Sequence, residues 1–199
     1  MATTPTPEIF VLSGPNGAGK STTATVLLPE TLDVEQFVNA GLIALGLSPF
    51  APEKSAIEAG RLMLRRIREL RRRGESFAFE TTLATRTYAP FLRDAQAAGY
   101  VVHLIYVWLQ NVELARSRVA VRVQQGGHDV PVEVVERRYL RGLRNFFSLY
   151  RPLADTWTLC DNSGDQVVIV ADGEKTGEVT VFEPATYDRI CKDGTDEST

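Results

Sequence analysis

The feature that most limits what this chain can fold into is a glycine-rich stretch near the N-terminus, GPNGAGKS at positions 14–21. Its first and last glycines, its lysine and its serine match the spacing G-x-x-x-x-G-K-[ST] of a phosphate-binding P-loop. The apolar run IFVL at positions 9–12 precedes it, and positions 22–28 can continue as a helix. A strand, a glycine loop and a helix in this order direct backbone N–H groups and the positive end of the helix dipole at one anion.

This loop predicts a site for a purine nucleotide, ATP or GTP, bound with Mg²⁺. Lys20 is expected to reach the β- and γ-phosphates, and the Ser21 hydroxyl is expected to ligate the metal. The predicted nucleotide-binding residues are Gly14, Pro15, Asn16, Gly17, Ala18, Gly19, Lys20, Ser21 and Thr22. The alternative is an ordinary glycine-rich turn between a strand and a helix, which does not require a match at every fixed position.

Composition and charge exclude several classes of protein. With 199 residues, 44% of them hydrophobic, the chain is long enough for a substantial core, and we predict a single domain over positions 1–199. A net charge of −3 argues against a nucleic-acid partner. No apolar run has membrane-spanning length, and the N-terminal MATTPTPE lacks the features of a signal peptide. Cys160 and Cys191 are interpreted as reduced cysteines, so we expect a cytoplasmic protein without a membrane partner.

Beyond the loop, strands and helices alternate as in a parallel doubly wound α/β sheet flanked by helices, the P-loop NTPase fold of kinase type. Further strands are predicted at positions 34–39, 76–81, 100–109 and 157–161, and helices at 52–74 and 87–98, with a short helical piece that starts at 39–42 and ends before 48. The run at 100–109 is apolar throughout, which predicts a strand covered on both faces. A C-terminal β-hairpin is predicted from positions 167–171 and 178–182, joined through Asp172-Gly173, and the tail after Lys192 is expected to fray.

Arginines gather in two parts of the chain. The helix at 52–74 has an apolar stripe of Ile57, Leu64, Ile67 and Leu70, and its other face is crowded with arginines. Because no aromatic residue is interleaved with them, we expect a solvated face rather than a basic binding surface. The helices at 112–125 and 131–150 are also rich in arginine and are hinged on Gly126-Gly127. We predict that they form a lid, at about 111–150, that closes over transferring phosphates; the alternative is a surface helical hairpin.

Several segments, taken in order, resemble the zeta-toxin-like P-loop kinases, in particular the bacterial branch labelled predicted ABC-type ATPase. They are FVNAGLIA, ESFAFETTL, RVQQGGHDVP with ERRY, and LCDNS, and the resemblance covers about positions 9–163. It implies transfer of the γ-phosphate of ATP or GTP to a hydroxyl of a nucleotide sugar, which is UDP-N-acetylglucosamine for the best-known members. Some members are toxins that an antitoxin protein neutralises, so the resemblance also implies an antitoxin partner.

The resemblance assigns roles to individual residues. Arg118, Arg122 and Arg138 would be the lid arginines that neutralise γ-phosphate charge, which suits a reaction that depends on positioning and electrostatic stabilisation. Ser21 and Glu80 would serve the metal, with Glu80 orienting metal-bound water. The residues expected to contact the acceptor are Asn39, Glu80, Thr81, Thr82 and His128.

Gly41 departs from the family pattern. Relatives usually have Asn-Ala-Asp at this point, and that Asp is the proposed base for the acceptor hydroxyl, whereas here Asn39-Ala40 is followed by Gly41. A positioned general base contributes about 10²–10⁴-fold, so we expect impaired kinase activity with nucleotide binding retained. Three explanations stay open: the substitution was introduced or selected because the active protein harms its host, the protein only binds nucleotide, or Glu80 takes over the proton transfer.

Two other functions compete with the kinase. The chain could be a non-catalytic nucleotide-binding module that works through a protein partner. It could also be a subunit of an ABC-type ATPase, but it lacks an LSGGQ-like signature, and the candidate Walker B strand ends in Trp108-Leu109-Gln110 rather than in an aspartate.

Overall fold

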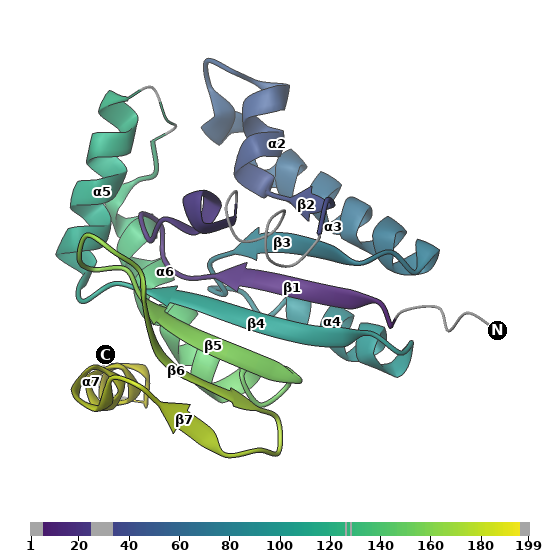
Figure 1. Ribbon diagram of the computed structural model, residues 1–199. Coiled ribbons are helices and arrows are strands. Elements are labelled where there is room, and N and C mark those ends of the chain that lie inside the picture. The colour runs from purple at the N-terminus through teal and green to yellow at the C-terminus, as the bar shows by residue number, and fades with distance from the viewer. Residues whose placement is uncertain (1–5, 25–33, 126, 128, 196–199) are drawn as a thin grey trace.

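The structure, a computed structural model, describes residues 6–24, 34–125, 127 and 129–195. These residues form one seven-stranded sheet in the order β2-β3-β1-β4-β5-β6-β7 (Figure 1). The strands are β1 (Glu8–Ser13), β2 (Phe37–Val38), β3 (Phe77–Thr81), β4 (Val101–Trp108), β5 (Thr156–Asp161), β6 (Val168–Glu174) and β7 (Val179–Val181). β1 to β5 pair in parallel, and β6 and β7 add an antiparallel hairpin. The predicted α/β fold with a mostly parallel sheet is confirmed.

Helices connect the parallel strands. They are α2 (Ala40–Leu47), the 3₁₀ helix η1 (Pro52–Ser55), α3 (Ala56–Arg73), α4 (Tyr88–Ala97), α5 (Val112–Gln124), α6 (Val132–Asn145), the π-helical turn η2 (Phe146–Tyr150) and α7 (Pro184–Thr195). A further helical stretch occupies residues 20–24, and the part of the first predicted helix beyond residue 24 lies outside the described residues. None of the helices within the described ranges is long and apolar enough to cross a bilayer.

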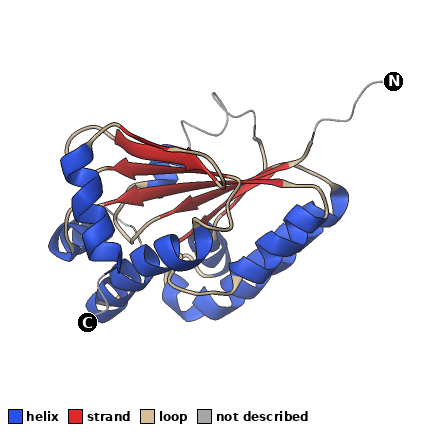
Figure 2. Cartoon of the chain, turned by 90° about the horizontal axis from the view of Figure 1, so that it is seen from below, coloured by secondary structure: helices blue, strands red, loops and turns tan. Residues whose placement is uncertain are grey.

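The main core lies between one face of the sheet and the helices gathered there (Figure 2). α3 contributes Met63, Ile67 and Leu70 to it, all fully buried. On the opposite face, Ala24 packs near Phe10 and Leu12, so the helix that begins at residue 20 crosses to the other side of the sheet from α3. Since the strands are parallel, the C-terminal ends of β1, β3 and β4 meet at one edge, where ligands of such sheets bind.

Several element bounds differ from the prediction. The second strand is only Phe37–Val38, not 34–39, and the predicted helix at 52–74 begins as the 3₁₀ turn η1 before α3. β4 alternates between buried and half-buried residues through much of its length, so it is not covered equally on both faces. Ile57 is 75% exposed because it precedes the part of α3 that packs on the sheet; Met63 supplies the buried contact instead.

The C-terminal part also differs. Asp172 and Gly173 were predicted to form the hairpin turn, but both lie within β6. Gly173 is needed there because a Cβ at this position would lie 2.9 Å from the Trp157 indole. After the hairpin, α7 buries Ile190 against the main core, a helix that the polar sequence of this segment did not predict.

Cys160 in β5 gives a prediction on pH. Burial raises the pKa of its thiol from 9.0 to about 11, so the folded protein keeps the proton that the unfolded chain releases. Stability from this group is therefore complete below pH 9 and falls as the pH rises from about 9 to about 11. Between about pH 8 and about pH 10, wild type should lose about 1 kcal/mol more unfolding free energy than Cys160→Ala. Urea unfolding under reducing conditions measures the difference; parallel pH profiles would contradict it.

Candidate functional site

The glycine-rich loop closes tightly after β1. Gly14 has φ 137° and approaches β4 so closely that a Cβ would lie 2.2 Å from the Val107 carbonyl oxygen. Gly17, with φ 80°, packs closely on α5, where a Cβ would be 2.7 Å from the Ala115 carbonyl oxygen. Only glycine combines these backbone angles with such contacts, so the local sequence fixes the curvature of the loop.

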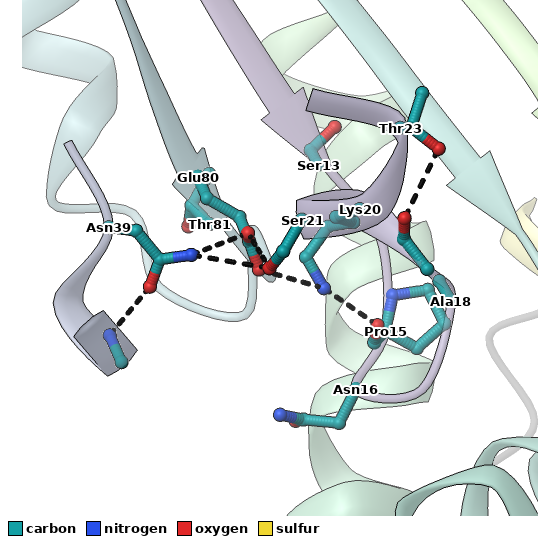
Figure 3. Close-up of polar contacts among 12 residues, drawn as sticks. Ser13, Pro15, Asn16, Ala18, Lys20, Ser21, Thr23, Asn39, Glu80 and Thr81 are labelled. Carbon is teal, nitrogen blue, oxygen red and sulfur yellow. Dashed lines mark hydrogen bonds and ion pairs between the residues drawn. The ribbon is translucent and has the colours of Figure 1, made fainter. Parts of the chain in front are cut away.

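Lys20 is held inside this loop. Its ammonium group donates a hydrogen bond to the Pro15 carbonyl oxygen at 2.8 Å and lies 3.6 Å from Glu80 Oε1, and the residue is only 5% exposed (Figure 3). Burial is the main cause of its lowered pKa, and Arg122 and Arg138 lower it further, while Glu80 opposes the shift. A buried ammonium group with two further cations nearby is electrostatically prepared for a polyanion.

Glu80, at the end of β3, connects the P-loop to the neighbouring strand end. Its Oε2 accepts hydrogen bonds from Ser21 Oγ and from Asn39 Nδ2, each at 2.6 Å (Figure 3). Asn39 Nδ2 also donates to Ser21 Oγ at 3.4 Å. A single carboxylate therefore contacts the lysine and the serine of the loop and the residue that precedes α2.

Asn39 is also the N-cap of α2. Its Oδ1 accepts the backbone N–H groups of Gly41 at 2.7 Å and Leu42 at 3.2 Å, the usual capping arrangement. The same side chain reaches Glu80 with its amide nitrogen, so α2 starts at the site. Position 41 therefore lies in the first turn of a helix that begins beside Glu80. Gly41 itself supplies only its backbone there.

The segment after β3 is held by α6 and η2. Gly142 of α6 is so close that a Cβ would lie 2.3 Å from the Thr82 carbonyl oxygen. Asn145 Nδ2 donates to the Leu83 carbonyl oxygen at 2.6 Å, and the Tyr150 hydroxyl donates to the Thr85 carbonyl oxygen at 2.6 Å. These contacts fix a backbone segment that starts beside Glu80.

The close approach at Gly142 can be tested by stability. Gly142→Ala is expected to lower the unfolding free energy by about 1–3 kcal/mol, the usual cost of overpacking. Gly60→Ala in α3 is the matched control, because a Cβ there meets nothing within 4 Å; it should raise stability by about 0.5–1 kcal/mol. Urea unfolding of both variants shows whether each substitution lowers or raises the unfolding free energy. A Gly142→Ala protein as stable as wild type would show that α6 does not press on the Thr82 backbone.

The loop after β5 supports the other side of the P-loop. Asn162 Nδ2 donates to the Ala18 carbonyl oxygen at 2.9 Å. Arg118 of α5 donates to the Asn162 carbonyl oxygen at 2.6 Å and makes longer contacts with the carbonyls of Ser163 and Gly164. This arginine therefore braces the loop that carries Asn162.

The two other predicted lid arginines are directed toward the P-loop. Arg138 donates to Asn16 Oδ1 at 3.3 Å, and the positive charge of Arg122 lowers the pKa of Lys20. Burial lowers the pKa of both guanidinium groups, so each cation is partly removed from water. Partly desolvated cations interact more strongly with an anion than fully solvated ones.

The structure thus gathers most of the predicted site but not all of it. Ser21, Asn39 and Glu80 form one hydrogen-bonded group that Lys20 joins through its ion pair with Glu80, whereas Thr81 Oγ1 accepts the Leu83 N–H in a turn. Thr82 follows that strand end, and His128 lies outside the described residues. Sequence reasoning did not assign roles to Asn162, Gly142 or Asn145, although Asn162 lies in the LCDNS segment that carried the resemblance.

Comparisons with known proteins agree with this geometry. The sequence model of the family described as zeta toxin matches residues 51–173. A Haemophilus influenzae protein described as uncharacterized is 32% identical over 127 residues, which is 63% of this chain and 88% of that protein.

Solved structures show the same fold. The crystal structure of AvrRxo1-ORF1:AvrRxo1-ORF2 with sulphate ions superposes with a TM-score of 0.76 at 20% identity over 97% of this chain, and the structure of that complex with ATP gives 0.74. This chain spans 66% of that relative's chain, just under two thirds. A structure from the PezAT toxin–antitoxin system of Streptococcus pneumoniae gives 0.69 at 16% identity, covering 99% of this chain and 82% of the other.

Proposed function

This chain belongs to the zeta toxin family, and on that premise we propose that it is a P-loop phosphotransferase. The proposed reaction transfers the γ-phosphate of ATP or GTP to a hydroxyl of a nucleotide sugar such as UDP-N-acetylglucosamine. It is slow in this chain because Gly41 stands where relatives have an aspartate. The observation that carries the proposal is the convergence of Lys20, Arg122 and Arg138 around a P-loop whose serine is hydrogen-bonded to Glu80.

The cations match the charge that phosphoryl transfer develops. Lys20 is already buried in the loop, so it can exchange its contacts with Pro15 and Glu80 for phosphate oxygens without being freshly desolvated. Arg122 and Arg138 approach from the predicted lid and can share the negative charge of the transferring group. Preorganised donors of this kind typically contribute about 10²–10³-fold each.

Ser21 and Glu80 have the chemistry to serve a magnesium ion. Their oxygens are 2.6 Å apart, and Mg²⁺ in phosphate sites is usually held by one or two protein oxygens, substrate phosphates and water. When bound, the metal would neutralise phosphate charge. The Ser21 hydroxyl could offer an oxygen lone pair to the metal, and Glu80 would be oriented by its hydrogen bond from Asn39.

The acceptor would be positioned by the end of β3 and by the start of α2. Asn39 and Glu80 are rigidly oriented by each other, and the backbone after Thr82 is fixed by α6. What the arrangement lacks at position 41 is a side chain that can accept the hydroxyl proton. We further propose a cytoplasmic protein of one domain and, by analogy with the toxin–antitoxin relatives, an antitoxin protein as its partner.

A direct assay tests the proposal. The purified chain is incubated with Mg²⁺, γ-labelled ATP or GTP and UDP-N-acetylglucosamine, and the phosphorylated sugar nucleotide is separated and identified by mass spectrometry. Thermal shift against each nucleotide reports binding separately, with about 2.7 kcal/mol of stabilisation expected at a hundred times the Kd. Binding with slow transfer supports the proposal. Binding without transfer, even when aspartate is restored at position 41, would favour the non-catalytic module instead.

A further inference from the structure

A groove between α3 and α4 carries a concentration of positive charge outside the proposed nucleotide site. It has a volume of about 460 Å³. Its lining residues are Arg61, Arg65, Arg68, Arg71, Arg72, Thr87, Pro90, Phe91 and Asp94. None of these belongs to the P-loop or to the Glu80 cluster, so a ligand here does not compete directly with a nucleotide.

Most of this charge is not compensated. Arg71 lies 4.0 Å from Asp94, the single acidic residue that lines the groove. Arg61, Arg65, Arg68 and Arg72 are exposed, and within the described ranges no carboxylate lies at ion-pair distance from them. α3 does contain acids, but its Glu69 pairs with two arginines that do not line the groove. Among the described residues, Arg71 is therefore the one groove arginine with an ion-pair partner, and the other four are left available.

The four unpaired arginines form a row. Positions 61, 65, 68 and 72 are spaced by four, three and four residues, so they lie on one face of α3, and the row is about 16 Å long. Successive arginines in the row are about 4.5–6 Å apart along the helix axis. In an extended peptide, side chains on one face repeat every ~6.6 Å, so alternating acidic residues come close to this spacing.

We propose that this groove binds an extended acidic segment of another protein, with alternate Asp or Glu side chains paired to the arginine row. Guanidinium groups form bidentate hydrogen bonds with carboxylates, so the affinity of such a contact depends on its geometry as well as on charge. The proposal takes up the alternative to a merely solvated helix face, the basic binding surface, because these arginines line a groove.

Two other polyanions fit the groove less well. Single-stranded nucleic acid is held by aromatic platforms, but the groove's one aromatic ring, Phe91, is 7% exposed and lies under the Arg71 guanidinium at 5.7 Å. An anionic bilayer is flat on this scale and would not reach the floor of a groove.

Fluorescence anisotropy with a labelled peptide of alternating Glu and Ala, at low ionic strength, tests the proposal. Wild type should bind it and should not bind a Gln-Ala peptide of the same length. Arg65→Glu/Arg68→Glu should weaken binding by roughly 10- to 100-fold. The matched control, Arg93→Glu/Lys175→Glu, changes net charge equally at exposed residues outside the groove and should stay within about twofold of wild type.

Circular dichroism verifies that each variant is folded. If Arg65→Glu/Arg68→Glu does not fold, Arg61→Gln/Arg72→Gln provides a second test that removes the charges without reversing them. An equal loss in the control variant would show that binding is only a response to net charge and would overturn the proposal. Tighter binding of an oligouridine than of the acidic peptide would overturn it in favour of nucleic acid. Absence of peptide binding by wild type would overturn it outright.

Discussion

Gly41→Asp is expected to raise the rate of phosphate transfer to the nucleotide sugar by about 10²–10⁴-fold, the usual contribution of a positioned general base. This expectation follows from the proposed function and from where position 41 lies. Gly41 follows the N-cap Asn39, whose side-chain amide is hydrogen-bonded to Glu80 and Ser21. A carboxylate there would lie in the first turn of α2, beside the groups that hold the phosphate-binding loop.

The same substitution should not harm the fold. Position 41 is the second residue of α2, where the partial positive charge of the helix N-terminus favours an aspartate by about 0.3–1 kcal/mol. Intrinsic helix propensity also favours aspartate over glycine, although only by about 0.3 kcal/mol. Thermal unfolding of the nucleotide-free protein should therefore show equal or higher stability, so any change in rate would not come from misfolding.

Gly41→Asn is the control that separates the base from the shape. Asparagine has nearly the same size and also suits a helix start, but it cannot accept a proton at neutral pH. Initial rates of transfer are measured for both variants at saturating MgATP. If Gly41→Asn is as fast as Gly41→Asp, the gain is due to positioning. If neither exceeds wild type, position 41 is not where the base acts, and Glu80 becomes the candidate that Glu80→Gln would test.

The P-loop and its neighbours were predictable because their constraints are local. Gly14 must be glycine because of its φ and its approach to β4, and the motif encodes that requirement directly. Asn39 could be predicted as the start of α2 for a similar reason, since it caps its own helix. The parallel pairing of β1 to β5 could be predicted from the alternation of strand and helix signals, but the order of the strands in the sheet was not predicted.

Contacts between distant residues were harder to predict. The bond from Asn162 to the Ala18 carbonyl and the anchoring of Leu83 by Asn145 depend on which loops meet at one sheet edge. Arg118, assigned to the γ-phosphate from the resemblance, instead donates to the carbonyls after β5, because α5 starts beside that loop. An arginine-rich helix pattern indicates charge, but only the packing of the helices decides which arginine faces which group.

Lys20→Met is expected to abolish useful nucleotide binding while leaving the fold intact or more stable. Burial lowers the pKa of Lys20, so the charged ammonium group destabilises the nucleotide-free protein. The nearby Glu80 offsets only part of that destabilisation. Methionine has a similar length and carries no charge that must be desolvated, and Glu80 keeps Ser21 and Asn39 as hydrogen-bond donors when the lysine is removed. With a triphosphate bound, the lysine would gain a strong anionic partner that methionine cannot supply.

The expected loss is about 10²–10³-fold in transfer rate, measured in the Gly41→Asp background, together with a clear rise in the Kd for MgATP. Lys175→Met, a substitution of an exposed lysine outside the site, should change neither quantity. Isothermal titration gives the affinity, and thermal unfolding without nucleotide gives the stability. The affinity should fall while the stability stays the same or rises, because the buried cation favours the ligand and does not favour the nucleotide-free protein. A Lys20→Met protein that binds MgATP as tightly as its parent would show that the triphosphate is not held in this loop.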